Sequence, residues 1–377
     1  MSFDPLMLRH DLHRIPELAY EEHKTKARLK AGIEAIIAAD PDGNELFARS
    51  EFLNSTGLLV TYQGGAEGAP YKLFRADMDA LPLKEETGSI CSSEYFGTMH
   101  ACGHDVHMAV LMGLISRVSS EHPKRNLMFL FQPAEEGKGG AQSVLAEGLI
   151  QKYSVTAAYA LHVAANMPVG TISSKAGIFF GIPQEFDLHF HGKASHVAFP
   201  EQGVNALDGA LDFMYCMKKD MDELQRRERV IFHVGKMSAG RVRNVIADEC
   251  VLEGTHRTLS IATRDEVNRL IELRARESAM AIGAKAEVEL LGTYEAVVND
   301  EGLYGKLKSV CRTLNYRFEE AETVMTGEDF GFFTSMYPGL LFWLGSGSDH
   351  PLHSPRFLPQ DECVAVGIDM MYALAIG

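Results

Sequence analysis

Short apolar runs alternate with amphipathic segments over much of the chain. The apolar runs of strand length are residues 71–76, 126–131, 157–161 and 340–344. Between the first two runs, Val110, Leu114 and their neighbours recur at helical spacing. Residues 5–14 and 20–39 also predict helices, which Pro16 separates. Strands that alternate with helices predict an α/β fold with a largely parallel sheet between helices.

The middle of the chain has a different pattern. Its predicted elements are a strand (184–191), a helix (204–227), two strands (230–236 and 249–257), a helix (264–282) and a strand (285–291). This βαββαβ order is typical of a two-layer, ferredoxin-like α+β domain. We therefore expect one domain at 1–179 and 293–377, and a second domain inserted at 180–292.

Length and composition agree with two domains. The chain has 377 residues, of which 46% are hydrophobic and 23% charged, as in water-soluble globular proteins. We found no apolar run long enough to cross a membrane and no export signal, and six cysteines without a pairing pattern suit a reducing compartment. We therefore expect a cytoplasmic protein. The net charge of −15 argues against nucleic acid as a partner.

A dense cluster of potential metal ligands occupies residues 99–107, Met-His-Ala-Cys-Gly-His-Asp-Val-His. Cysteine thiolate and imidazole suit zinc, and carboxylates extend the range to manganese. A closed structural zinc site would need paired Cys-x-x-Cys motifs, which the sequence lacks. A metal bound at Cys102 and His104 must therefore take further ligands from distant segments.

Those further ligands are expected just after the predicted strands, because ligands gather beyond the carboxyl ends of parallel strands. The candidate ligands are Cys102, His104, Glu136, His162 and His353. Five donors exceed one tetrahedral ion but match two ions about 3.5–4 Å apart. In the Glu135–Glu136 pair, one carboxylate can bind metal while the other moves a proton. The candidates for orienting the ligand imidazoles are Asp79, Asp105, His100 and His107.

Four motifs resemble those of the M20 metallopeptidase and amidohydrolase family, in its branch of N-acyl amino acid amidohydrolases. They are residues 75–82 (Arg-Ala-Asp-Met-Asp-Ala-Leu-Pro), 100–105 (His-Ala-Cys-Gly-His-Asp), 131–136 (Phe-Gln-Pro-Ala-Glu-Glu) and 160–163 (Ala-Leu-His-Val). The resemblance implies hydrolysis of an N-acyl amide by a di-metal catalytic domain at 1–179 and 293–377. It also implies that residues 180–292 form a lid domain through which two chains form a homodimer.

The same resemblance implies roles for individual residues. Cys102 would bridge the two metals, and Glu135 would be the general acid and base. His196 would reach from the lid domain to stabilise the oxyanion, in its own site or in the partner's. Asn244 and Arg257 would contact the substrate carboxylate.

A narrower likeness concerns the substrate. Residues 139–142, 325–331 and 342–345 resemble bacterial N-acetyldiaminopimelate deacetylases. This implies cleavage of N-acetyl-LL-diaminopimelate to LL-diaminopimelate and acetate, in lysine biosynthesis. Residues 350–354 and Ser195 depart from that pattern, which leaves the acyl group and side chain open. The alternatives are a broader amidohydrolase of the hippurate or acetylcysteine type, a dipeptidase, and a non-enzymatic metal-bound scaffold. The metals implied are zinc or manganese, with cobalt or nickel also permitted.

Overall fold

The computed structural model describes residues 3–377, which divide into two compact units. Unit 1 consists of the described part of Met1–Phe179 together with Val297–Thr323 and Asp329–Gly377, and unit 2 consists of Phe180–Ala296 and Val324–Glu328. Unit 2 is thus interrupted in sequence as well as inserted. Within residues 3–377, no helix has both the length and the apolar character that a membrane span requires.

Unit 1 is built on a ten-stranded sheet in which β1, β2, β4, β3, β5, β14, β12 and β7 lie in that order, while β6 and β13 pair off this path. The strands are β1 (Phe47–Glu51), β2 (Leu58–Gln63), β3 (Tyr71–Asp77), β4 (Asn126–Gln132), β5 (Val155–Ala164), β6 (Thr171–Ser174), β7 (Gly177–Phe180), β12 (Val297–Asn299), β13 (Arg317–Glu320) and β14 (Gly339–Gly345). Strands β4, β3, β5 and β14 run parallel to their neighbours in this series, which confirms the predicted largely parallel sheet. Strand β2 is antiparallel to β4 and carries β1 at the edge of the sheet.

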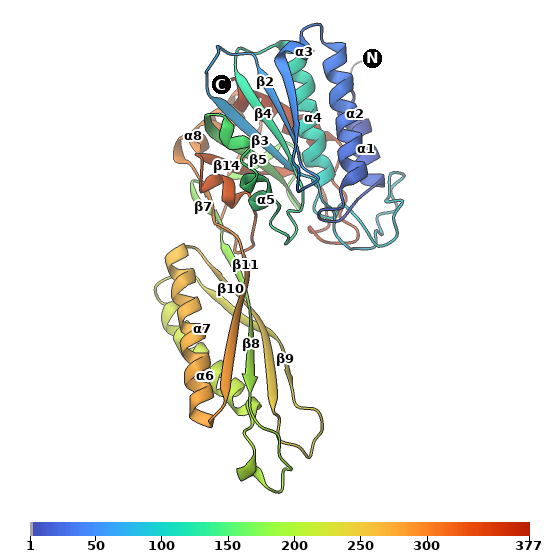
Figure 1. Cartoon of the computed structure of the whole chain (residues 1–377). Helices are drawn as coiled ribbons and strands as arrows, with labels where there is room; N and C mark the ends of the chain where they lie inside the picture. Colours follow the sequence, from blue (N-terminus) through green and yellow to red (C-terminus); the bar gives the residue numbers. More distant parts are fainter. Residues whose placement is uncertain (1–2) are drawn as a thin grey trace. The chain divides into compact units, whose positions relative to one another are not determined.

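Helices cover this sheet. They are α1 (Pro5–Arg14), α2 (His23–Ala39), α3 (Gly43–Leu46), α4 (His104–Glu121), α5 (Gly140–Ala146), η1 (Ile150–Lys152), α8 (Glu301–Leu314), α9 (Gly331–Thr334) and α10 (Glu362–Ile376). Helix α4 lies beside α1 and α2 (Figure 1) and also packs against β3 and α10, while α5 contacts β4 and α9 contacts β14. Every residue of β4 is buried, as expected for a strand covered on both faces.

The parallel register places the ends of the central strands beside one another. Asp77 at the end of β3 is paired with Gln132 at the end of β4, and His162 of β5 is paired with Trp343 of β14. Side chains that follow apolar runs far apart in sequence therefore gather at the carboxyl ends of the central strands.

Unit 2 contains β8 (Ile182–His191), η2 (Pro200–Gln202), α6 (Ala206–Leu224), β9 (Ile231–Ala239), β10 (Glu249–Thr258), α7 (Ile261–Ile282) and β11 (Lys285–Thr293). Its antiparallel sheet has the order β11–β8–β10–β9, with α6 and α7 on one face (Figure 1). Phe186, Leu188 and Phe190 alternate along β8 and are fully buried in the core of this unit. The predicted ferredoxin-like order is thereby confirmed.

Candidate metal centre

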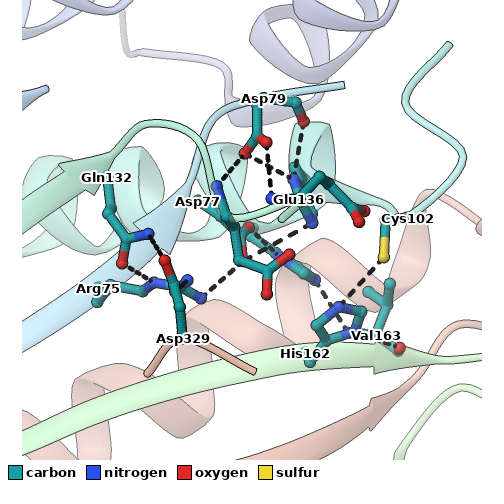
Figure 2. Close-up of polar contacts among 12 residues, drawn as sticks. Arg75, Asp77, Asp79, Cys102, Gln132, Glu136, His162, Val163 and Asp329 are labelled. Carbon is teal, nitrogen blue, oxygen red and sulfur yellow. Dashed lines mark hydrogen bonds and ion pairs between the residues drawn. The ribbon is translucent and has the colours of Figure 1, made fainter. Parts of the chain in front are cut away.

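The thiol of Cys102 lies at the centre of a cluster of metal-binding side chains. Its Sγ is 3.4 Å from Nε2 of His162 and 3.3 Å from Nε2 of His353, and the same His353 nitrogen is 3.4 Å from Oε1 of Glu136. Figure 2 shows Cys102 beside His162 and Glu136. The turn that follows Cys102 requires glycine at position 103 (φ +81°), because a Cβ there would lie 2.4 Å from Cγ2 of Val163.

The five ligands expected from the sequence lie together as two groups of three that share one member. One group is Cys102 with His104 and His162, and the other is Cys102 with Glu136 and His353. Within each group the ligand atoms lie within 4.8 Å of one another. A thiolate common to two such groups is the arrangement that a bridging ligand between two ions requires.

In two of the imidazoles, a hydrogen bond made by Nδ1 fixes the orientation of the ring. Nδ1 of His104 donates to the carbonyl oxygen of Asp79 (2.8 Å), and Nδ1 of His162 donates to that of Val163 (2.9 Å). Because a carbonyl oxygen only accepts, Nδ1 carries the proton, and Nε2 is left with a lone pair in neutral imidazole. Nε2 of His104 is buried without a hydrogen-bond partner. A buried nitrogen of this kind fits a cation, so the residues present are compatible with bound metal.

Burial and neighbouring charges together control protonation within the cluster. Burial raises the pKa of the Cys102 thiol well above the ordinary value and lowers the pKa of His162 well below it. Burial also lowers the pKa of His104, but Asp77 and other neighbours outweigh burial and raise that pKa well above the ordinary value. Burial also raises the pKa of Glu136, but His353 and His104 outweigh it and hold that carboxyl ionised. A divalent cation would displace the thiol proton, so cation binding is expected to release protons.

His107 is close to His104 and Asp77 but has no lone pair left for a metal. Its Nδ1 donates to Oδ1 of Asp77 (2.6 Å), and its Nε2 accepts from the backbone N–H of Val163 (3.0 Å). His107 therefore links β3 to β5 beside His162.

A buried network that the sequence reasoning missed supports the same edge of the sheet. Arg75 binds Oδ2 of Asp77 (2.7 Å), Oδ1 of Asp329 (2.6 Å) and Oε1 of Gln132 (2.9 Å), as Figure 2 shows. Burial raises the pKa of Asp77, but His104, His107 and Arg75 outweigh it and keep the pKa well below the ordinary value. An arginine within an apolar strand was the available signal, because a buried guanidinium requires carboxylate partners.

Asp79 and Asp105, the two aspartates expected to orient ligand imidazoles, have different partners. The Asp79 carboxylate accepts from the backbone N–H groups of Glu135 (3.0 Å) and Glu136 (2.9 Å), and its Oδ1 also lies 3.6 Å from Nδ1 of His104, which donates to the Asp79 carbonyl. The Asp105 carboxylate accepts from Arg9 (3.2 Å) and His13 (3.1 Å) on α1. The first carboxylate thus positions the glutamate loop, and the second fixes α4 against α1.

Glu135 is buried, with 7% of its surface exposed, and its carboxylate lies within 4.8 Å of the ligand atoms of His104 and Glu136. Adjacent glutamates therefore both face the cluster. Glu136 also belongs to the group around Cys102 and His353. Glu135 is thus a second carboxylate beside the cluster, as expected for a residue that moves a proton.

The three candidate residues of unit 2 lie at two ends of its sheet. His196 and Asn244 are exposed neighbours, since Val197 N donates to Asn244 O (3.2 Å) and His196 forms a β-bridge with Val245. Arg257 lies near the far end of β10. At about 3.4 Å per residue, the eight steps from Glu249 to Arg257 span about 27 Å. A single small molecule bound to one copy of unit 2 cannot contact both Asn244 and Arg257.

Comparisons with known proteins agree with this geometry. The family model described as peptidase family M20/M25/M40 matches residues 73–376. A protein of Geobacillus sp. (strain WCH70) named N-acetyldiaminopimelate deacetylase is 37% identical, over 98% of this chain and 97% of its own. A Bacillus subtilis (strain 168) protein of the same name is 35% identical, over 97% and 96%.

Two solved structures have the same fold. The YXEP protein of Bacillus subtilis, described as a dinuclear metal binding peptidase from the M20 family, aligns with a TM-score of 0.84 and 28% identity over 99% of this chain and 96% of its own. A protein from methicillin-resistant Staphylococcus aureus aligns with a TM-score of 0.90 over 99% and 95%, and its 24% identity supports the fold alone.

Proposed function

The chain belongs to peptidase family M20/M25/M40, and from this premise we propose that it holds two divalent cations and hydrolyses the amide bond of an N-acyl amino acid. One observation carries the proposal: two groups of three ligands share Cys102 and lie beside the buried Glu135. A structural metal site has no need of the additional carboxylate.

The proposed chemistry assigns a separate task to each residue. Cys102, His104, His162, Glu136 and His353 hold the cations, which when bound supply Lewis-acid polarisation and lower the pKa of water. Glu135 takes a proton from the attacking water and passes it to the nitrogen of the leaving amine. His196 would donate a hydrogen bond to the oxyanion. The products are an amino acid and a carboxylic acid, so one water is consumed for each amide cleaved.

We propose zinc or manganese as the metals. Thiolate and imidazole favour zinc, whereas the carboxylate of Glu136 also suits manganese, and cobalt or nickel fits the same donors.

For the substrate we propose N-acetyl-LL-diaminopimelate, which would yield LL-diaminopimelate and acetate in lysine biosynthesis. Relatives at 37% and 35% identity that carry the name N-acetyldiaminopimelate deacetylase support this choice. In this proposal Asn244 and Arg257 contact substrate carboxylate groups. The alternatives are hippurate-type or acetylcysteine-type amides and dipeptides. Comparing kcat/KM on these four substrate types tests the choice, and negligible relative activity on N-acetyl-LL-diaminopimelate would remove it.

We propose a homodimer formed through unit 2, acting as lid and dimerisation domain. The apolar side chains of Leu211 (55% exposed) and Tyr215 (59% exposed) lie on α6. Helix α6 packs over the half of the sheet that ends in the edge strand β9. The length of β10, about 27 Å, also favours a dimer, because one substrate could then contact Asn244 of one copy and Arg257 of the other. In such a dimer, His196 and Asn244 of one copy would serve the partner's site. All six cysteines are unpaired, which supports a cytoplasmic location.

The decisive experiment distinguishes the proposed role of Glu135 as the base from the role of a metal ligand. We expect Glu135→Gln to retain metal and lose turnover by about 10²–10⁴-fold, the range for a lost general base. Metal binding has its own readout, because the single tryptophan, Trp343, lies 5.3 Å from the His162 ring. Co²⁺ titrated into metal-free protein is therefore expected to quench tryptophan fluorescence in both the wild type and Glu135→Gln. Undiminished turnover in Glu135→Gln would exclude Glu135 as the base, whereas a wild-type protein that binds Co²⁺ without turnover on any of the four substrate types would favour the scaffold alternative.

A further inference from the structure

Three successive peptide N–H groups in the loop after β4 donate to two carboxylates from distant parts of the chain. The N–H groups of Glu135 and Glu136 donate to Asp79, as described above. The N–H group of Ala134 donates to Oε1 of Glu22 at 2.9 Å. The backbone that carries the proposed base is thus held from two sides.

The segment held in this way has an unusual conformation. Ala134 is fully buried and left-handed, with φ +57°. For a residue with a Cβ this conformation is sterically disfavoured. Its carbonyl accepts from Gly140 N (3.0 Å), where a Cβ would lie 1.7 Å from the carbonyl oxygen of Pro133. The bond from Ala134 N to Glu22 fixes the peptide plane at the entry to this turn, and hence the direction in which Glu135 leaves it.

The side chain of Glu22 hydrogen-bonds to this loop and not to the helix that Glu22 precedes. It is the residue before α2, but its side chain caps no N–H of that helix. The carboxylate is fully buried, and its second oxygen accepts from Oγ1 of Thr56. Both of these donors are neutral. Burying a carboxylate without a cationic partner is costly, so stability alone does not explain a glutamate here.

We propose that Glu22 is a positioning residue for Glu135, acting through the Ala134 peptide. This inference rests on the proposed function, in which Glu135 moves the proton. A catalytic group must be held to within about 0.5 Å of its productive position. A displacement of about 1 Å costs roughly 10²-fold in rate.

The test compares three variants in the intact metal-loaded protein. We expect Glu22→Ala to lower kcat by about 10–100-fold, with KM changed less than about twofold and metal content unchanged. Glu22→Gln is expected to restore kcat to within about threefold, because its amide oxygen can accept from Ala134 N while its NH₂ group donates to Thr56. Glu21→Ala is the matched control, since this neighbouring carboxylate is exposed; it should leave kcat and KM unchanged.

A double variant separates this inference from the proposed function. If Glu22 acts through Glu135, then adding Glu22→Ala to Glu135→Gln should cause no further loss of turnover. An unchanged kcat in Glu22→Ala would overturn the positioning role, and so would an equal loss of metal in the Ala and Gln variants. If Glu22→Ala fails to fold, Glu22→Asp replaces it, since the shorter side chain retracts from Ala134, and wild-type kcat in that variant would also overturn the role. Full turnover in Glu135→Gln alone would instead overturn the proposed function.

Discussion

A buried imidazolium between α1 and α4 makes the stability of unit 1 depend on pH. His13 on α1 is 2% exposed, and each of its nitrogens faces a carboxylate. Nδ1 lies 3.1 Å from Oδ2 of Asp105, and Nε2 lies 3.3 Å from Oε1 of Glu85. Burial lowers the pKa of His13, but Asp105 and Glu85 outweigh burial and raise the pKa to about 9 from an ordinary value of 6.5.

The sign of the effect follows from these two values. Because the pKa of His13 is higher in the folded protein than in the unfolded chain, its contribution is fully present below pH 6.5. The contribution is lost as the pH rises through about 9. A difference of about 2.5 pKa units corresponds to about 3 kcal/mol in the free energy of unfolding.

Replacing His13 by Asn tests this value, since the amide N–H can still donate to Asp105 while the titrating charge is removed. We expect the difference in unfolding free energy between wild type and His13→Asn to shrink by about 3 kcal/mol between pH 6 and pH 10. Urea unfolding of metal-free protein measures this without a contribution from metal binding. The control is His10→Asn on the same helix, where the imidazole is 34% exposed. A wild-type to His13→Asn difference that stays constant with pH would refute the reasoning.

Three further predictions concern the network, the ligands and the dimer. Arg75→Met should lower the free energy of unfolding by about 3–5 kcal/mol in urea, because it removes the buried guanidinium that pairs with both Asp77 and Asp329; a loss below about 1 kcal/mol would contradict this. Glu136→Ala should lower the metal content measured by mass spectrometry while the protein stays folded, and full occupancy would show that it is no ligand. Tyr215→Glu should convert a dimer to a monomer in light scattering, whereas a persisting dimer would exclude this face of α6.

Much of the fold could be predicted because the decisive signals are local. Apolar runs of strand length and helical spacing depend on residues a few positions apart. The predicted helix 5–14 has the bounds of α1, and the other predicted elements fall within a few residues of the observed ones. Helix α2 begins at His23 and not at residue 20, because Tyr20 is left-handed with φ +65°. Glu136 and His162 could be proposed as candidate metal ligands on the same local grounds, since each lies in or just after a buried strand.

The supporting contacts could not be predicted because they join residues that share no local pattern. Arg75 and Asp329 are 254 positions apart, and Glu22 and Ala134 are 112 positions apart. An arginine in an apolar strand indicates that a carboxylate partner exists, but not which one. The left-handed Ala134 has no signal at all, because glycine is the residue that usually marks this conformation.

Two residues with strained backbone conformations indicate that the fold itself positions the site residues. Both Ala134, which precedes the proposed base, and His353, a proposed ligand, have positive φ (+57° and +63°). Each is tied by its own N–H, Ala134 to Glu22 and His353 to the carbonyl oxygen of Ala101 (2.9 Å). Such conformations persist only where surrounding contacts over-determine them. Packing and hydrogen bonds of unit 1 therefore supply the energy that holds the proposed base and one proposed ligand in place, so residues that never touch substrate should influence turnover.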